Sequence, residues 1–465
     1  AFIQLSLLFF HVFKEPTLFA LSSSFNLLLI YLFYQRKEIS LDPLTRVPNR
    51  TLFLERLKQY VHKKQQATLI LFDIENFRLI NARYTNTNAD LLLWHFATFL
   101  SESWENHEVF RLVGNRFLLS FPPLQHNQIV RVVKEVKARC AEGWEVKEHL
   151  ISFFVNTAIV QLPLNHNSVE EIIESLDFTL YEIKEKRKHS AIIFNQKLIN
   201  VRQRRLDVLS AIKETIHNPF HMMVYYQPII DITDNSIIGA EALMRLENEQ
   251  LGLISPGEFI PAAEQSGLIS YLTVIMVEKV CSFISEFKAH TTHLSHISIN
   301  ISATDLGSSE VVQKLLTIFE KADIDTQKIG FEVTETMLIE SKESVYSSWN
   351  AFKEKGIHFL LDDFGTGYSN LQTVVNLPFE TIKIDRSVVS NENNDYELMT
   401  LLSDMLKKLG KQMVAEGVET KQQLQAVRDN GIRYVQGYYF SKPIPEQEFL
   451  DYITGAMCIL PSVKK

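Results

Sequence analysis

Residues 224–245 read VYYQPIIDITDNSIIGAEALMR, and this stretch decides how the second half of the chain folds. It holds two apolar segments, 224–230 and 240–245, with only about ten residues between them and Asp234-Asn235 at the expected turn. A parallel crossover needs a dozen or more residues, whereas a β-hairpin fits easily in that interval. The spacing therefore predicts that the first strand runs antiparallel to the second.

Further candidate strands follow toward the C-terminus, and helical patterns separate most of them. Eight strands joined by helical crossovers are typical of a (β/α)8 barrel. We therefore expect a modified TIM-like barrel with an antiparallel first strand over residues 224–462. The remaining strands are expected at 296–302, 329–335, 358–364, 381–386, 412–418 and 434–440.

Residues 40–197 have a different pattern, which predicts a separate domain. Short apolar segments such as 68–74 and 116–121 alternate with helical stretches such as 88–104. This favours an α+β domain with a mainly antiparallel sheet, so that the fold class of the whole chain is α/β. Residues 198–223 are interpreted as a connecting helix. The charged run KEKRK at 184–188 is interpreted as a solvated face.

The first 37 residues are mostly apolar, in two runs at 1–13 and 18–34, with Arg36-Lys37 after the second. A run of 17 residues is near the lower limit for crossing a bilayer, and basic residues hold their end on the cytoplasmic side. The pattern predicts short transmembrane helices in residues 1–37, at the end of a longer membrane region. A pair of buried or dimerising helices is the alternative.

The overall charge excludes some partners. A net charge of −8 with a pI near 6.0 argues against binding of DNA or RNA polymers, because such proteins need a basic face. Three cysteines lie far apart and form no CxxC pair, which indicates reduced thiols and not disulfides or a zinc site.

Polar side chains, most of them acidic, end the predicted barrel strands. The C-terminal strand ends of a barrel meet at one face, where carboxylates about 4 Å apart would repel by about 4 kcal/mol per pair at an effective dielectric near 20. Divalent cations relieve this repulsion, and oxygen ligands without Cys or His favour Mg²⁺ or Mn²⁺. One such acid alone is more often a turn, a cap or an ion pair, but a series at successive strand ends predicts a metal site. The residues are Glu241, Asn300, Glu332, Glu335, Asp362, Asp363, Lys383, Asp385, Glu416, Glu419 and Gln436.

The segments that carry these residues are similar to the EAL phosphodiesterases, in the same order over the whole second domain. The resemblance implies a homodimeric enzyme that hydrolyses cyclic di-GMP (c-di-GMP) to linear pGpG with two divalent ions, Mg²⁺ or Mn²⁺. The similar segments are YYQPII, EALMR, SINIS, FEVTET, LLDDFGTGYSNL, LPFETIKIDRSVV, VAEGVET and YVQGYYFSKPI.

The resemblance also implies a role for individual residues. Lys383 and Gln436 would position the attacking water, with Glu416 or Lys383 assisting its deprotonation. Glu335 would brace the loop after its strand and so support metal binding and dimer contacts. The implied metal ligands are Glu241, Asn300, Glu332, Asp362, Asp363 and Glu416. The implied substrate-binding residues are Gln227, Leu243, Arg245, Asp385 and Glu419.

The first domain resembles the GGDEF diguanylate cyclases at 42–50, 72–81 and 179–184, but its signature differs. Residues 113–117 read VGNRF, where the family has two glycines, two acids and Phe. Asn115 and Arg116 replace the acids, and a guanidinium cannot ligate a cation. We therefore expect a degenerate, inactive cyclase domain that serves regulation or dimerisation. Further departures are Ala82, Thr85, Asn86, Ala89 and the sequence WENH, which replaces an inhibitory RxxD.

Some features of a cyclase remain. Asp73 stands at the first metal position, and Asn81 and Asp90 match guanine-contacting positions. These residues would allow the domain to keep a weakened GTP site. The alternative is that the domain serves only as a folded spacer. The whole chain is thus predicted to be a phosphodiesterase in the bacterial inner membrane with its catalytic domains in the cytoplasm. The alternative is a non-catalytic c-di-GMP receptor that signals through the membrane segment.

Overall fold

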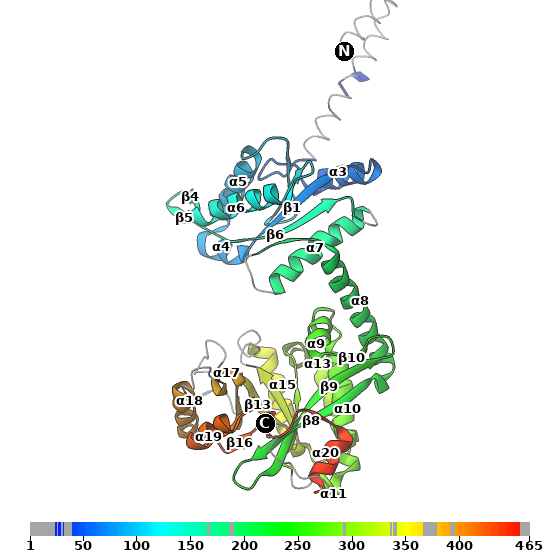
Figure 1. Cartoon of the computed structure of the whole chain (residues 1–465), viewed down its shortest axis with the longest axis vertical. Coiled ribbons are helices and arrows are strands. Elements are labelled where there is room, and N and C mark those ends of the chain that lie inside the picture. The colour runs from blue at the N-terminus through cyan, green and yellow to red at the C-terminus, as the bar shows by residue number, and fades with distance from the viewer. Residues whose placement is uncertain are drawn as a thin grey trace, which may run out of the picture. The chain divides into compact units, whose positions relative to one another are not determined.

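The computed structural model divides into two compact units, Ala1–Arg202 and Gln203–Lys465 (Figure 1). Among the residues that it describes, no helix is both long and apolar enough to cross a bilayer. Most of the predicted membrane segment, residues 1–37, lies outside the described part. The described residues are 24, 25, 27, 28, 31, 40–164, 168–185, 190–291, 294–334, 337, 342–365, 379–390 and 396–455.

The first unit is built on a sheet of order β2-β3-β1-β6-β7. The central strand β1 runs antiparallel to both β3 and β6, and only the β6–β7 pair is parallel, so the mainly antiparallel sheet is confirmed. A two-stranded ladder, β4 (Trp144–Val146) with β5 (His149–Ile151), lies outside this sheet. The strands of the main sheet are β1 (Ala67–Ile74), β2 (Glu108–Arg111), β3 (Arg116–Phe121), β6 (Val155–Leu162) and β7 (Ala191–Ile193).

Helices cover both faces of this sheet because its central strand is buried on both sides. Ile70 and Phe72 of β1 pack in one core with α5 and α6, whereas Leu69 and Leu71 pack in a second core with α3 and α7. This alternation is the period of two that a strand imposes on its side chains. The helices are α3 (Arg50–His62), α4 (Phe77–Tyr84), α5 (Asn86–Glu102), α6 (His126–Glu142) and α7 (Val169–Glu185).

The second unit is a closed barrel of eight strands. The first strand, β8, pairs antiparallel with both β9 and β16, while the other barrel neighbours pair in parallel. Asn235 turns the β8–β9 hairpin with a φ of 59°, which confirms the predicted hairpin and antiparallel first strand. The barrel strands are β8 (Met222–Asp231), β9 (Ser236–Asn248), β11 (His296–Asn300), β12 (Ile329–Thr334), β13 (His358–Phe364), β14 (Thr381–Ile384), β15 (Gln412–Ala415) and β16 (Tyr434–Val435).

Short strands and helices surround the barrel, as Figure 1 shows. The unit boundary falls within α8 (Gln196–His217). β10 (Gly252–Ile254) and β17 (Ile444–Pro445) extend the sheet beside β9 and β8. The helices are η1 (Pro219–His221), α9 (Pro256–Gln265), α10 (Ile269–Glu286), α11 (Lys288–Thr291), α12 (Ala303–Gly307), α13 (Ser309–Lys321), η2 (Thr326–Lys328), α15 (Lys342–Glu354), α17 (Arg386–Val389), α18 (Glu397–Lys408), α19 (Lys421–Asp429) and α20 (Glu446–Ile453).

Two late strands end earlier than the sequence pattern predicts. β15 stops at Ala415, because Gly417 has a φ of 65° and turns the chain out of the sheet. β16 stops at Val435, and a Cβ on the following Gly437 would lie 2.2 Å from the Val418 carbonyl oxygen. The two glycines thus bring the loops after β15 and β16 into close contact at the C-terminal end of the barrel.

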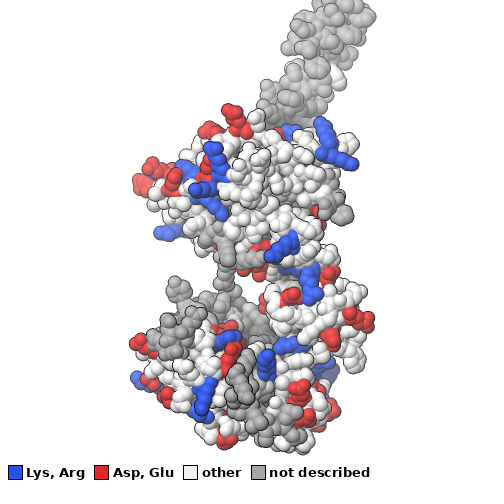
Figure 2. All heavy atoms as spheres, in the orientation of Figure 1, with Lys and Arg blue, Asp and Glu red and all other residues white. Residues whose placement is uncertain are grey.

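Charged side chains of both signs lie on the face of the two units that Figure 2 shows. Figure 2 shows lysine and arginine interspersed with aspartate and glutamate on the face in view. Of the acids discussed next, Glu241 and Glu332 are buried, Asp362 and Glu416 are half-buried and Asp363 is exposed.

Candidate metal centre

Four carboxylates converge on one buried ammonium group at the C-terminal end of the barrel. Lys383 lies on β14 and is only 1% exposed, and its partner Glu332 on β12 is fully buried. The partners come from β9, β12 and β13 and from the residue that follows β15. The Lys383 Nζ lies 2.6 Å from Glu416 Oε1, 2.8 Å from Glu332 Oε2, 3.2 Å from Glu241 Oε2 and 3.4 Å from Asp362 Oδ1.

Strand register explains why side chains distant in sequence meet here. Gln227 is the cross-strand partner of Glu241, and Asn300 is the cross-strand partner of Glu332. Asn300 Nδ2 donates to Glu241 Oε1 at 2.8 Å, while Gln436 Nε2 donates to Glu241 Oε2 at 2.6 Å. Gln436 also donates to Gln227 Oε1 at 3.1 Å. Two amides therefore fix the Glu241 carboxylate, and a third amide extends the network.

An irregularity in β13 allows two successive acids to serve one site. Neighbouring residues of a regular strand point to opposite faces. The pairing of β13 with β14 shifts between Leu361 and Phe364, and Asp363 has a φ of 56°. A bulge of this kind re-aims side chains, often beside active sites. Ligand atoms of Asp362, Asp363 and Glu416 consequently lie within 4.8 Å of one another.

Burial and mutual repulsion raise the pKa of most of these carboxyls. Burial, followed by the nearby Glu241, raises the pKa of Glu332 well above its usual range. Burial likewise raises the pKa of Glu416 to about 8, although Lys383 acts in the opposite direction. Burial and the adjacent Asp362 raise the pKa of Asp363. The site therefore holds more acidic groups than its own residues can stabilise in the ionised form.

Glu241 and Lys383 are shifted toward their charged forms. Burial alone would raise the pKa of Glu241, but Lys383 and the two amides outweigh it and lower that pKa. Burial would lower the pKa of Lys383, but the surrounding carboxylates, with Glu241 first, raise it well above its usual range. The ammonium is thus a fixed positive charge near neutral pH.

These residues fit divalent cations. Four carboxyls surround a single ammonium group, Asp363 lies beside two of these carboxyls, and all five offer oxygen atoms as ligands. The Oδ1 atom of Asp362 is buried and accepts no hydrogen bond within the described part of the chain. Hard cations such as Mg²⁺ prefer such oxygen ligands, and their charge would relieve the repulsion. Among the described residues, Asp362, Asp363 and Glu416 form a group of candidate ligands whose atoms lie within 4.8 Å of one another.

The residues expected to contact substrate are placed unevenly around this centre. Leu243 and Arg245 share the face of β9 that carries Glu241, because side chains alternate along a strand. The Arg245 guanidinium lies 5.3 Å from the centre of the Tyr225 ring, and its Nη1 donates to the Met244 carbonyl at 2.8 Å. Gln227 Nε2 donates to the carbonyl of Ser441 at 3.3 Å.

Two of the expected contacts have clear structural partners, and one predicted residue lies outside the described part. Asp385 is the N-cap of α17 and accepts from the Ser387 backbone N–H at 2.7 Å. Glu419 forms an ion pair with Arg386 at 3.2 Å. Glu335, predicted to brace its loop, lies outside the described residues.

Sequence reasoning missed Ser298. This buried side chain donates from Oγ to Glu332 Oε1 at 2.5 Å, so it occupies the carboxylate oxygen that Lys383 does not contact. Ser298 precedes Asn300 by two residues on β11 and therefore faces the same side of the strand. The alternation of side chains along a strand places Ser298 on the same face as Asn300, and this pattern could have predicted Ser298 from the sequence.

Asp73, which stands at the predicted first metal position of the first unit, pairs with two positively charged side chains of the protein. Asp73 on β1 is 3% exposed; Lys184 Nζ lies 2.6 Å from its Oδ2, and Arg116 Nε lies 3.1 Å from its Oδ1. Arg116 Nη1 also contacts Asp177 Oδ1 at 3.0 Å. Asn115 Nδ2 donates to the Ile74 carbonyl. Lys184 is 49% exposed, in agreement with the interpretation of 184–188 as a solvated face, but its ammonium also pairs with the buried Asp73 carboxylate. Residues 186–188 lie outside the described part of the chain.

The two positions that we predict to match guanine-contacting residues lie on two adjacent helices. Asn81 is on α4 and Asp90 is on α5, and the two helices pack together. Of the other departures, Thr85 sits between these helices with a φ of 72°, a backbone conformation that favours glycine. The Thr85 side chain therefore stands where the chain turns between the two predicted contacts.

The chain belongs to the EAL domain family, whose homologues include c-di-GMP phosphodiesterases. The family model for the EAL domain matches residues 210–443, just over half of the chain. The model described as diguanylate cyclase, GGDEF domain, matches residues 39–190, so the two domains stand in tandem.

Among curated proteins the chain is similar to two from Pseudomonas aeruginosa. It is 24% identical over 417 residues to the bifunctional diguanylate cyclase/cyclic di-GMP phosphodiesterase MucR, covering 88% of this chain and 61% of that protein. It is 26% identical over 412 residues to the cyclic di-GMP phosphodiesterase NbdA, covering 87% of this chain and 52% of that protein. The chain therefore spans little more than half the length of these relatives.

A solved structure shares the tandem fold. The S helix-GGDEF-EAL portion of LapD from Vibrio cholerae, bound to c-di-GMP, gives a TM-score of 0.59 at 17% identity. The match covers 89% of this chain and 99% of that one. At this identity the likeness concerns the fold alone.

Proposed function

We propose that the second unit hydrolyses c-di-GMP to linear pGpG with two divalent ions, Mg²⁺ or Mn²⁺. One observation carries this proposal: Lys383 is surrounded by more buried carboxylates than it can neutralise, at the end of the barrel where active sites form. The similarity to proteins named as c-di-GMP phosphodiesterases supports the choice of substrate.

The chain's own residues would hold the ions and the reacting groups. When bound, the two ions would polarise the phosphate and make water a stronger nucleophile. The ligands would be Glu241, Asn300, Glu332, Asp362, Asp363 and Glu416. Gln436 would orient the water through the amide that now binds Glu241. Gln227, Leu243, Arg245, Asp385 and Glu419 would line the substrate path.

The roles of Lys383 and Glu416 follow from their charges. Lys383 has a strongly raised pKa, so it is a poor base and would instead stabilise negative charge on the phosphate. Glu416 would be held in its ionised form by the positive charge of the bound ions, against the raised pKa that burial gives it, and would then accept the proton of the attacking water. The water oxygen would bond to phosphorus, the bond from phosphorus to one ribose 3′ oxygen would break, and that oxygen would take up the proton that Glu416 has removed from the water. The product is a linear dinucleotide with a 5′ phosphate.

The test is hydrolysis of c-di-GMP by the purified chain with Mg²⁺ or Mn²⁺, followed by detection of pGpG. Glu241→Ala should lower turnover by at least about 100-fold, because it removes a ligand and frees two amides. Glu247→Ala is the matched control, since Glu247 is an exposed acid on the same strand. Absence of turnover by the unaltered chain, or full turnover by Glu241→Ala, contradicts the proposal.

A receptor that binds c-di-GMP without cleaving it is the second candidate. The observation that favours it is that Lys383 already compensates part of the negative charge. Binding of c-di-GMP in the presence of a chelator, with no pGpG after long incubation with Mg²⁺ or Mn²⁺, would select this candidate over the enzyme.

We further propose that the first unit is a degenerate GGDEF domain that makes no c-di-GMP and serves regulation or dimerisation. Arg116 and Lys184 occupy the Asp73 carboxylate, so a metal ion would have to displace two cations. Incubating the Glu241→Ala chain with GTP and Mg²⁺ should give no c-di-GMP. Measuring hydrolysis with and without GTP in the unaltered chain tests whether this domain senses GTP.

Attachment to the bacterial inner membrane through residues 1–37, with both units in the cytoplasm, is part of the same proposal. Fractionation of cells that express the chain with and without these residues tests it. Recovery of the full chain in the soluble fraction would contradict it. Sedimentation of the purified protein tests the proposed homodimer.

A further inference from the structure

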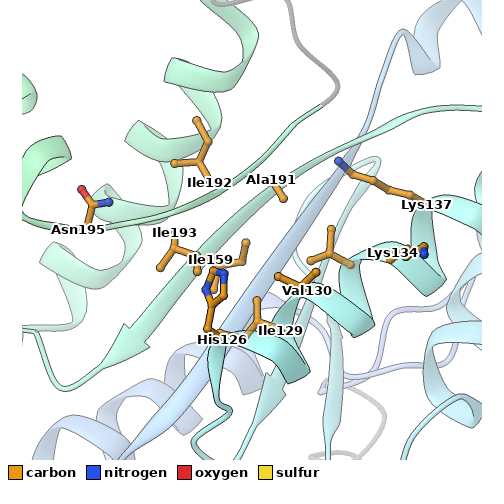
Figure 3. A pocket seen from close by; sticks show the side chains of 11 residues that line it. His126, Ile129, Val130, Lys134, Lys137, Ile159, Ala191, Ile192, Ile193 and Asn195 are labelled. Atoms are coloured by element: carbon orange, nitrogen blue, oxygen red, sulfur yellow. The ribbon is translucent and has the colours of Figure 1, made fainter.

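An apolar groove lies on the first unit between helix α6 and the edge strand β7 (Figure 3). Its volume is about 780 Å³, within the range of pockets that hold small molecules. Among the described residues it shares no lining side chain with the Asp73 cluster. Helix α6 contributes Ile129, Val130 and Val133, and β7 contributes Ala191, Ile192 and Ile193.

The groove is elongated along α6. Figure 3 shows Ile159 of β6 between the helix and β7, with His126 at the start of α6 and Lys137 further along the helix. At about 1.5 Å per helical residue, the eleven steps from His126 to Lys137 span about 16 Å. One acyl chain covers about half of a bilayer's hydrocarbon core of about 30 Å, so the two lengths match.

The charge of the groove has one sign. Lys134 and Lys137 line it together with His126, and no acid is among the described lining residues. In Figure 3 the Lys137 side chain extends from α6 toward Ala191 on β7. Burial lowers the pKa of Lys137, which means that water solvates its ammonium incompletely. A negative group beside a partly desolvated ammonium forms a stronger hydrogen bond than it does in water.

We propose that this groove binds a long-chain carboxylate of about a dozen carbons, as a ligand of the first unit. The alkyl chain lies between α6 and β7, and the carboxylate lies at the end formed by Lys134 and Lys137. An added peptide strand fits less well, because β7 offers an edge of only three residues. The alkyl stems of the two lysines cover the alkyl chain of the ligand while their ammonium groups face its carboxylate.

The test is calorimetric titration of the purified chain with sodium laurate below its critical micelle concentration. We expect saturable binding at one site per chain, and at least tenfold weaker binding of dodecanol, which lacks the charge. Val130→Asp should weaken laurate binding at least tenfold, and Val130 is 50% exposed, so the change does not disturb the core. Lys134→Glu should weaken it about fivefold, whereas Lys58→Glu, an exposed lysine of α3, should leave it unchanged.

Several outcomes would overturn the assignment. They are no saturable binding of laurate, equal binding of laurate and dodecanol, or unchanged binding after Val130→Asp. A Val130→Asp chain that binds laurate normally but sediments differently would assign the groove to a second copy of this chain instead. None of these measurements depends on hydrolysis of c-di-GMP.

Discussion

The two units each hold a buried acid at the end of a strand, but the charge around it is balanced in one and unbalanced in the other. In the first unit, Asp73 and Asp177 face Arg116 and Lys184, so acids and cations are equal in number. In the second, Lys383 is the ammonium group for four carboxylates within 3.4 Å. In a balanced cluster the protein's own cations neutralise the acids, whereas an unbalanced cluster of acids favours the binding of cations from solution.

Exposure makes the contrast sharper. The Arg116 and Lys184 side chains are 36% and 49% exposed, so water can solvate them if Asp73 is lost. Lys383 and Glu332 are 1% and 0% exposed, so neither can be solvated if the other is lost. The same kind of substitution should therefore have a larger effect in the second unit.

The largest effect is expected from Lys383→Met. Removing one member of a buried ion pair destabilises proteins by about 3–5 kcal/mol, because the remaining charge is left uncompensated. In Lys383→Met several carboxylates lose their common partner, so we expect the free energy of unfolding to fall by an amount in this range in metal-free buffer. Urea unfolding, with hydrogen exchange of β12 and β14 amides to localise the effect, measures it. Lys421→Met, at an exposed position of α19, is the control; a loss below about 1 kcal/mol for Lys383→Met contradicts the comparison.

Divalent ions should stabilise only the second unit. At a concentration one hundred times its dissociation constant, a ligand of the folded state adds about 2.7 kcal/mol. At that concentration we expect Mg²⁺ or Mn²⁺ to slow hydrogen exchange in the barrel strands by about 100-fold, which corresponds to this free energy. Asp362→Asn should abolish this protection, and Asp73→Asn should retain it. Equal protection of β1 in the first unit would show that the balanced cluster also takes a metal ion.

Asp73→Asn should destabilise the first unit by less than Lys383→Met destabilises the second. We expect about 2 kcal/mol, the contribution of hydrogen bonds that involve charged groups, since both cations can turn to water. Denaturant unfolding with exchange of β1 and β3 amides measures it. Asp177→Asn is the control, because Asp177 is 54% exposed and contacts only one of the cations; it should cost about 0.5 kcal/mol or less. A loss for Asp73→Asn as large as that for Lys383→Met would remove the distinction.

The contrast between the units was only partly predictable from sequence. Period and spacing were sufficient for the hairpin of β8 and β9 and for the barrel, because both depend on local pattern and chain length. Acids at strand ends likewise indicated one shared site. Sequence could not show that Lys383 contacts four of them, since that depends on where the ends of separate strands meet.

Two residues make contacts that the sequence pattern does not reveal. Lys184 lies in a charged run, and its pairing with Asp73 arises only because α7 packs on the sheet that carries this acid. Asp385 stays a predicted substrate contact, and its carboxylate also accepts a hydrogen bond from the first turn of α17. A short acid after a strand serves a helix cap as readily as a ligand, and the pattern of residues does not distinguish the two.

The smallest effect is expected at Asp231, a balanced acid within the second unit. Burial would raise its pKa, but hydrogen bonds from Arg433 and Thr233 outweigh it and lower the pKa to about 2. Because the folded pKa lies below the ordinary value of 3.8, the stabilisation is complete above that value and is lost as the pH falls toward 2. Asp231→Asn should therefore cost about 1 kcal/mol at pH 7, since Arg433 is largely exposed, and progressively less as the pH falls from 3.8 through about 2. Urea unfolding between pH 5 and 2 measures this, with the exposed Glu249→Gln as control; a loss that does not change with pH would mean that packing, and not charge balance, holds Asp231.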